Sequence, residues 1–159
     1  MIKLISALAL GLSLFAFACQ NNTKINNANT NSAANKTTEV SFTVAKNYFV
    51  NNTVTKLDNP KIETEEQFSQ VFGMARTMGE DGKPTAIDFS KQYVIAVVLP
   101  ETDLSTNIEA ISLQKSANNE ITLNYKVVRG QKQSYTMRPS LLLIVDKKDN
   151  GAVKLNENK

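Results

Sequence analysis

Ser112 and Lys115 form the one catalytic spacing that stands out in this sequence. They spell S-x-x-K, the pattern with which penicillin-binding enzymes place a lysine beside a serine nucleophile for acyl transfer. That chemistry needs both side chains one helical turn apart. Here the pattern lies in a strand-like segment, where positions i and i+3 face opposite sides. The partner motifs are also missing, so we expect no enzyme of this kind.

Cys19 is the only cysteine, and the chain has no histidine. These two facts exclude a Ser-His-Asp triad, a Cys-His nucleophile and a zinc site built from histidine or thiolate ligands. The acids of the loop around Glu80 and Asp81 could suggest a cation site, but their spacing does not match an EF-hand. We therefore expect no metal, no cofactor and no enzymatic activity.

Cys19 follows a leader typical of bacterial lipoproteins. Lys3 supplies a positive charge, Leu4 to Phe15 are mostly apolar, and Ala16-Phe17-Ala18 places small residues before the cysteine. This pattern predicts a signal peptide over residues 1–18 and acylation of Cys19. An ordinary secretory signal is the alternative, and the apolar run is too short to span a bilayer.

Several acyl chains on one cysteine give stable membrane attachment. Gln20 stands where an aspartate would resemble a signal for retention in the inner membrane. The sequence therefore favours the outer membrane of the cell envelope, without deciding between its periplasmic and surface faces.

The net charge of +3 comes from the leader and the segment after it. Lys3, Lys24 and Lys36 account for this excess, and from Glu39 onward basic and acidic residues balance. A neutral domain without an aromatic-studded basic groove argues against a nucleic-acid partner.

Residues 19–38 are rich in Asn, Thr, Ser and Ala, and they predict a disordered tether behind the acylated cysteine. Residues 39–159 then form a single domain. Its centre is the run Tyr93–Leu99, which is apolar on both strand faces and predicts a strand covered on both sides.

A helix is predicted before this strand, because Thr64 and Gln67 form a capping box ahead of an apolar face. The other apolar runs read as strands, and Asn118-Asn119, Gly130-Gln131 and Asp149-Asn150-Gly151 as the turns of hairpins. We predict an α+β fold of about seven or eight strands, mainly antiparallel, as a rolled sheet or sandwich with one helix packed on it.

Two segments are the candidate partner-binding sites. The first is the predicted hairpin Tyr125–Arg138, which carries Lys, Arg, Tyr and Met side chains without an acid; the second is a predicted polar loop, Glu101–Asn107. Tyr and Arg anchor many protein interfaces, although a solvated strand face would have the same composition. The candidate residues are Arg129, Tyr135 and Arg138 from the first segment, and Thr102 and Asp103 from the second.

The segment Ala86–Val97, with Asp-Phe-Ser-Lys at 88–91 ahead of an apolar strand, resembles the opening of the C-terminal domain of PrcB, a lipoprotein subunit of a bacterial protease complex. The resemblance covers roughly Phe68 to Lys147 and includes Pro139 before a final apolar strand. The glycines that the family usually has after the central strand are replaced here by Thr102-Asp103-Leu104-Ser105-Thr106.

This resemblance implies a non-enzymatic lipoprotein that associates with a protease or another envelope protein. Two further hypotheses stay open. One is a lipid-anchored peptidase inhibitor that presents loops to an active site, and the other is an enzyme or small-ligand carrier.

Overall fold

A computed structural model describes residues 36–76, 78–79 and 82–159 of the chain. Cys19, most of the predicted tether, and Glu80 and Asp81 of the acidic loop lie outside these residues. No helix in the described part is long and apolar enough to cross a membrane.

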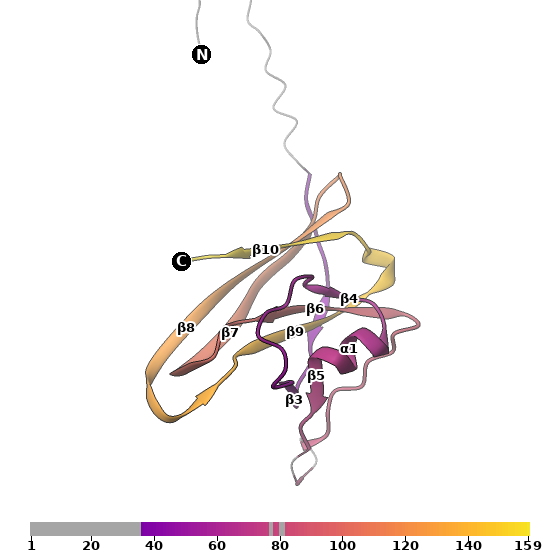
Figure 1. Ribbon diagram of the computed structural model, residues 1–159. Helices are drawn as coiled ribbons and strands as arrows, with labels where there is room; N and C mark the ends of the chain where they lie inside the picture. The colour runs from indigo at the N-terminus through magenta and orange to yellow at the C-terminus, as the bar shows by residue number, and fades with distance from the viewer. Residues whose placement is uncertain (1–35, 77, 80–81) are drawn as a thin grey trace, which may run out of the picture. The chain divides into compact units, whose positions relative to one another are not determined.

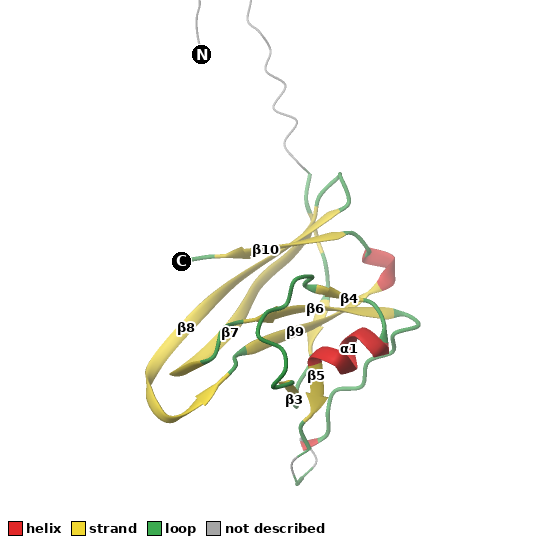
Figure 2. Ribbon diagram, in the orientation of Figure 1, coloured by secondary structure: helices red, strands yellow, loops and turns green. Residues whose placement is uncertain are grey.

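Strands dominate the described residues, and there is a single α-helix (Figure 2). The strands are β1 (Thr38–Glu39), β2 (Phe42–Val44), β3 (Tyr48–Val50), β4 (Lys61–Ile62), β5 (Phe72–Met74), β6 (Gln92–Val98), β7 (Thr102–Lys115), β8 (Glu120–Met137), β9 (Ser140–Asp146) and β10 (Ala152–Glu157), with α1 at Glu65–Val71. The predicted α+β class is confirmed, and the two or three strands beyond the predicted number are short.

The strands form two four-stranded sheets and a small two-stranded one. The first sheet has the order β1-β7-β8-β10, the second β2-β9-β6-β4, and the small sheet pairs β3 with β5. Every pairing is antiparallel except that of β10 with β8, which is parallel.

The two four-stranded sheets pack face to face around the main core. Its fully buried members come from both sheets and include Tyr93, Ile95, Leu113, Leu123 and Leu143. The opposite face of β6 and β9 carries a second core, in which Val94 and Ile144 contact Phe68 of α1 and Phe72 of β5. The central strand β6 is therefore covered on both sides, as the sequence predicts.

Helix α1 begins at the predicted cap. Thr64 Oγ1 accepts a hydrogen bond from the Gln67 amide at 3.2 Å, and Gln67 Oε1 accepts one from the Glu63 amide at 2.9 Å. The helix ends at Val71, because the chain turns directly into β5 there. Its Phe68 ring packs edge-on against Tyr48 of β3, with 5.0 Å between ring centroids.

Strands β7 and β8 form one long curved hairpin (Figure 1). Its turn is Ser116–Asn119, where Asn119 adopts a left-handed backbone and donates its amide to the Ser116 carbonyl. A bulge near Ile111 is present as a register shift between Ala110 and Ser112.

Two predictions about this hairpin are wrong. Gly130-Gln131 is not a turn, since β8 runs straight through it to Met137, and residues 102–107 are not a loop, since they belong to β7. The pairs Thr106↔Arg129, Leu104↔Lys132 and Thr102↔Met137 show why: backbone pairing continues across successive register shifts. An irregular, polar ladder of this kind leaves no alternating apolar signal in the sequence.

The predicted hairpin around Asn150 is also wrong. A 3₁₀ turn at Lys147–Asp149 carries the chain from β9 to the other sheet, where Ala152 pairs with Glu120 and Leu155 with Leu123. The apolar side chains Val153 and Leu155 pack there against the main core. β10 is an edge strand of the first sheet.

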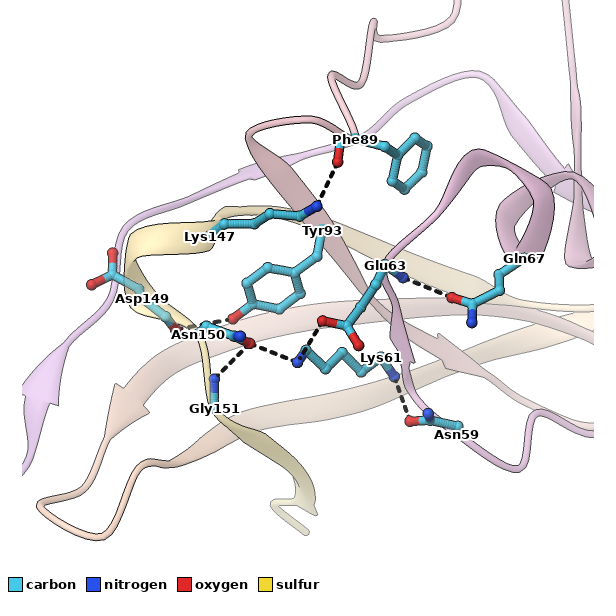
Figure 3. A network of polar contacts seen from close by, with 10 residues as sticks. All are labelled: Asn59, Lys61, Glu63, Gln67, Phe89, Tyr93, Lys147, Asp149, Asn150 and Gly151. Atoms are coloured by element: carbon cyan, nitrogen blue, oxygen red, sulfur yellow. Dashed lines mark hydrogen bonds and ion pairs between the residues drawn. The ribbon is translucent and has the colours of Figure 1, made fainter.

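A polar network holds this crossover in place (Figure 3). Lys61 Nζ donates to Asn150 Oδ1 at 2.6 Å, pairs with Glu63 at 2.9 Å, and lies 5.2 Å from the centroid of the Tyr93 ring. Tyr93 donates its hydroxyl hydrogen to the Asp149 carbonyl, and burial raises the pKa of Tyr93, so this group stays protonated. Lys61, Tyr93 and Lys147 each donate to a segment that is distant in the sequence, which indicates a structural role.

Candidate functional site

A groove of about 810 Å³ lies between β3 on one side and the β7, β8 and β9 strands on the other. Its lining residues are Tyr48, Phe49, Val50, Asn52, Glu101, Thr106, Asn107, Ile108, Thr136, Met137, Arg138, Pro139 and Ser140. The volume falls within the range of sites that bind ligands or peptide segments.

Arg138 connects the two sides of the groove. Its Nη1 donates to the Val54 carbonyl, in the segment after β3, and its Nη2 lies 3.4 Å from Glu101 Oε2. Glu101 also accepts a hydrogen bond from the Thr136 hydroxyl. Only 17% of the Arg138 side chain is exposed. Its Nε is buried and has no partner among the described residues.

Phe49 forms the exposed part of the β3 wall, with half of its surface accessible. It pairs across strands with Gly73, and a Cβ built on Gly73 would lie 2.3 Å from Phe49 Cζ. The ring therefore lies flat over a glycine that offers no side chain of its own, an arrangement known to support isolated strand pairs.

Tyr48 turns its side chain away from solvent beside Phe49. Its hydroxyl donates to the Thr85 carbonyl at 2.7 Å, and burial raises its pKa. The groove thus has a neutral aromatic wall opposite the ion pair of Arg138 with Glu101.

The structure separates the five predicted partner-binding residues. Arg138 lies in the groove, Thr102 and Arg129 line a smaller neighbouring pocket of about 150 Å³, and Tyr135 is 59% exposed on β8. Asp103 is joined to Lys132 by an ion pair of 2.9 Å.

The predicted basic face of Tyr125–Arg138 is largely neutralised. Lys126 pairs with Glu109 across the hairpin, Lys132 with Asp103, and Arg138 with Glu101. The bond from Lys126 holds the pKa of Glu109 below its usual value. The sequence pattern missed these acids because Asp103 and Glu109 lie on the other strand of the hairpin and Glu101 lies just before it.

The β3 side of the groove was not predicted either. The run Tyr48-Phe49-Val50 was correctly expected to be extended. However, its place opposite Arg138 depends on contacts between distant parts of the chain. The S-x-x-K pattern has a plain structural explanation, since both residues lie in β7 and Ser112 Oγ accepts a hydrogen bond from Asn124 at 2.9 Å.

No protein-family model, curated protein or solved structure matches this chain. Among the described residues, no three His, Cys, Asp or Glu side chains gather in a way that could hold a metal ion.

Proposed function

We propose that this protein is a lipid-anchored binding protein of the cell envelope, without enzymatic activity of its own. Acylated Cys19 attaches it to the membrane, with the outer membrane favoured by Gln20. Its partner is a protease or another envelope protein, as the resemblance to the PrcB family implies.

The observation that carries this proposal is the distance between the groove and the point where the described chain enters the first sheet. β1 pairs with the last residues of β7, Thr38 with Lys115, so the described chain enters the first sheet at that end. The groove meets β7 at Thr106–Ile108. At about 3.3 Å per strand residue, these points lie roughly 25 Å apart. The groove is therefore separate from the end of the sheet at which the described chain begins, which leaves it accessible to a partner.

The inhibitor hypothesis has less structural support. It needs loops that enter an active site, whereas residues 102–107 are paired in β7 and the neighbouring feature is a concave groove. A concave surface receives a segment of a partner. We therefore favour an accessory role over inhibition.

Cys19→Ala tests the anchor. Without the thiol no diacylglycerol can be attached, so we expect the variant to move from the membrane pellet to the soluble fraction, while wild type stays in the pellet and incorporates labelled fatty acid. Ala18→Gly is the matched control, because it keeps a small residue before the cysteine and should remain acylated. A Cys19→Ala protein that remains in the membrane after carbonate washing contradicts the proposal.

Crosslinking in the native cell tests the partner. We expect wild type to crosslink to an envelope protein whose peptidase activity, if it has any, is unchanged after addition of the purified lipoprotein. Loss of that activity at stoichiometric amounts would instead support the inhibitor. Turnover of peptide or ester substrates by the purified lipoprotein alone would contradict a non-enzymatic role.

A further inference from the structure

We propose that the groove takes up an extended, uncharged segment of the partner protein, which adds as a strand to the free edge of β7. This inference rests on the proposed binding function and specifies its mode. Strand addition of this kind gains affinity from main-chain hydrogen bonds and specificity from alternate side chains.

The free edge of β7 follows from its hydrogen-bonding pattern. The Asn158 amide donates to the Tyr125 carbonyl, so the main chain of Tyr125 points away from β7. Because the two edges of a strand alternate residue by residue, its opposite neighbour Ala110 points away from β8. The amides and carbonyls of Ile108 and Thr106, which are two and four residues from Ala110, share this direction.

On the side of β7 that faces away from β8, a neighbouring strand is present at only one end. β1 pairs with Gln114 and Lys115, the Val40 amide still reaches the Leu113 carbonyl, and the chain then crosses to the second sheet as β2. Among the described residues, no strand pairs with β7 at Thr106 and Ile108 on the side away from β8. Both of these residues line the groove.

The edge of β3 at Tyr48 and Val50 borders the same groove, beyond Lys46, whose amide and carbonyl both bond Thr85. The bonds from Ala75 to the Asn47 carbonyl and from Asn51 to the Val71 carbonyl show that the odd-numbered residues around β3 face β5. Tyr48 and Val50 therefore direct their main-chain groups to the other side. In the described part of the chain, β3 has β5 as its only strand neighbour.

The side chains of the groove define the chemistry of the segment. Its two charged residues, Glu101 and Arg138, pair with each other, and Phe49 and Met137 supply apolar surface. Asn52 and Asn107 add amides. A neutral groove attracts neither a positively nor a negatively charged segment. Desolvating a charged segment in it would be unfavourable. The best fit is an uncharged segment with apolar side chains at alternate positions.

The outer edge of β8 is the competing strand edge. β10 covers it only as far as Tyr125. Beyond that point it carries Lys126, Arg129 and Lys132 and passes through repeated register shifts, two features that protect edges from pairing. We therefore place the partner segment at β7.

The test uses the full acylated chain in detergent and a display library of random linear peptides as the probe. We expect the enriched peptides to be uncharged, with alternating apolar residues. On binding, hydrogen exchange should slow at the Thr106 and Ile108 amides and stay unchanged at Val127 and Arg129. Failure to enrich any peptide, or protection confined to the β8 edge, overturns the proposal.

Proline variants locate the edge. Thr106→Pro removes an amide that points into the groove and that the β7–β8 ladder does not use, so it should weaken the selected peptides by about tenfold or more. Thr106→Ala keeps the amide and removes the same hydroxyl, and it should bind within about twofold of wild type. Arg129→Pro is the matched change on the β8 edge and should leave binding intact.

Both proline variants must melt cooperatively to be informative. If Thr106→Pro fails to fold, the test instead uses the wild-type protein and selected peptides that are methylated on alternate backbone nitrogens. Two methylation registers are possible, and peptides of one register should lose binding. Equal binding by both registers contradicts strand addition. Membrane attachment and capture of a partner that survive such a result would leave the proposed function standing while this binding mode fails.

Discussion

Arg138 holds two distant segments of the molecule together. It was predicted as an interface anchor, yet its guanidinium bonds the Val54 carbonyl and faces Glu101, and it is mostly buried. A residue in this position shapes the groove from within. We therefore expect Arg138 to affect partner binding by setting the distance between the two walls of the groove.

Arg138→Ala should lower the free energy of unfolding by about 1.5–3 kcal/mol, the usual size for hydrogen bonds to a charged group. The variant should also weaken the binding of any ligand to the groove. Arg129→Ala is the control, since Arg129 is exposed and such changes cost less than about 0.5 kcal/mol. Urea denaturation of both variants measures the difference, and an Arg138→Ala protein as stable as wild type would show that the bond to Val54 contributes little.

Asp88 is the residue whose titration the structure predicts most directly. The Ser90 hydroxyl and the Ser90 amide both donate to Asp88 Oδ1, at 2.5 and 3.0 Å, and these bonds hold the pKa of Asp88 below its ordinary value of 3.8. Because the folded pKa is the lower one, the stabilisation is fully present above the unfolded value. It is lost as the pH falls through the folded pKa.

Ser90→Ala removes the hydroxyl donor and should move the pKa of Asp88 up towards 3.8 while the amide bond remains. NMR titration of the Asp88 carboxyl carbon measures the shift. Lys91→Ala serves as the comparison, since the ion pair of Lys91 with Asp88 at 3.4 Å is exposed and contributes less to the lowered pKa. A larger pKa shift for Lys91→Ala than for Ser90→Ala would contradict the larger contribution of Ser90.

At the scale of elements, the β7–β8 hairpin differs most from expectation. Gly130 and Gln131 have the composition of a two-residue turn, but they lie within β8, and no positive φ is found at Gly130. The strand remains paired because Leu104 and Thr102 of β7 continue the ladder. Tertiary pairing thus overrides the local turn preference.

Gly130→Ala distinguishes a continuous strand from a hairpin turn at this position. A Cβ at this position would be 3.4 Å from Ser105, which is ordinary contact, so we expect a change in unfolding free energy within about 0.5 kcal/mol. A glycine with positive φ in a hairpin turn would instead be strained by alanine, at about 1 kcal/mol or more. Thermal denaturation decides between them, and a clear loss of stability would restore the turn.

At the scale of the described domain, the crossover after β9 joins the two sheets. It brings β10 into the first sheet parallel to β8, so the core is closed by a strand from the far end of the sequence. The contact of Lys61 with Asn150 adds a tie from β4 (Figure 3). Gly151 lies at the point where this segment passes the β7–β8 turn.

Gly151→Ala should destabilise the domain by about 1–3 kcal/mol, the usual cost of overpacking. A Cβ there would lie 2.3 Å from the Asn119 carbonyl oxygen, which is backbone and cannot rotate away. The melting temperature should fall by several degrees, and hydrogen exchange should rise first in β10. A melting temperature equal to that of Gly130→Ala would mean that the crossover at Gly151 can move away from Asn119 without loss of stability.

The sequence alone determined the features that depend on neighbouring residues. The apolar faces of Tyr93–Leu99 predicted a doubly covered strand, Thr64 and Gln67 predicted the start of α1, and the Asn118-Asn119 pair predicted the hairpin turn. Each of these signals is local, because strand alternation, helix capping and turn formation act over a few residues.

Only the tertiary structure decided which strands pair and what the groove contains. Arg138 and the segment after Pro100 were singled out by composition, but Phe49 and its place opposite them were not. The acids that neutralise Lys126, Lys132 and Arg138 likewise lie in or just before another strand, β7. Backbone hydrogen bonds are the same for every residue type except proline, so long polar ladders and free strand edges are set by the packing of the whole domain.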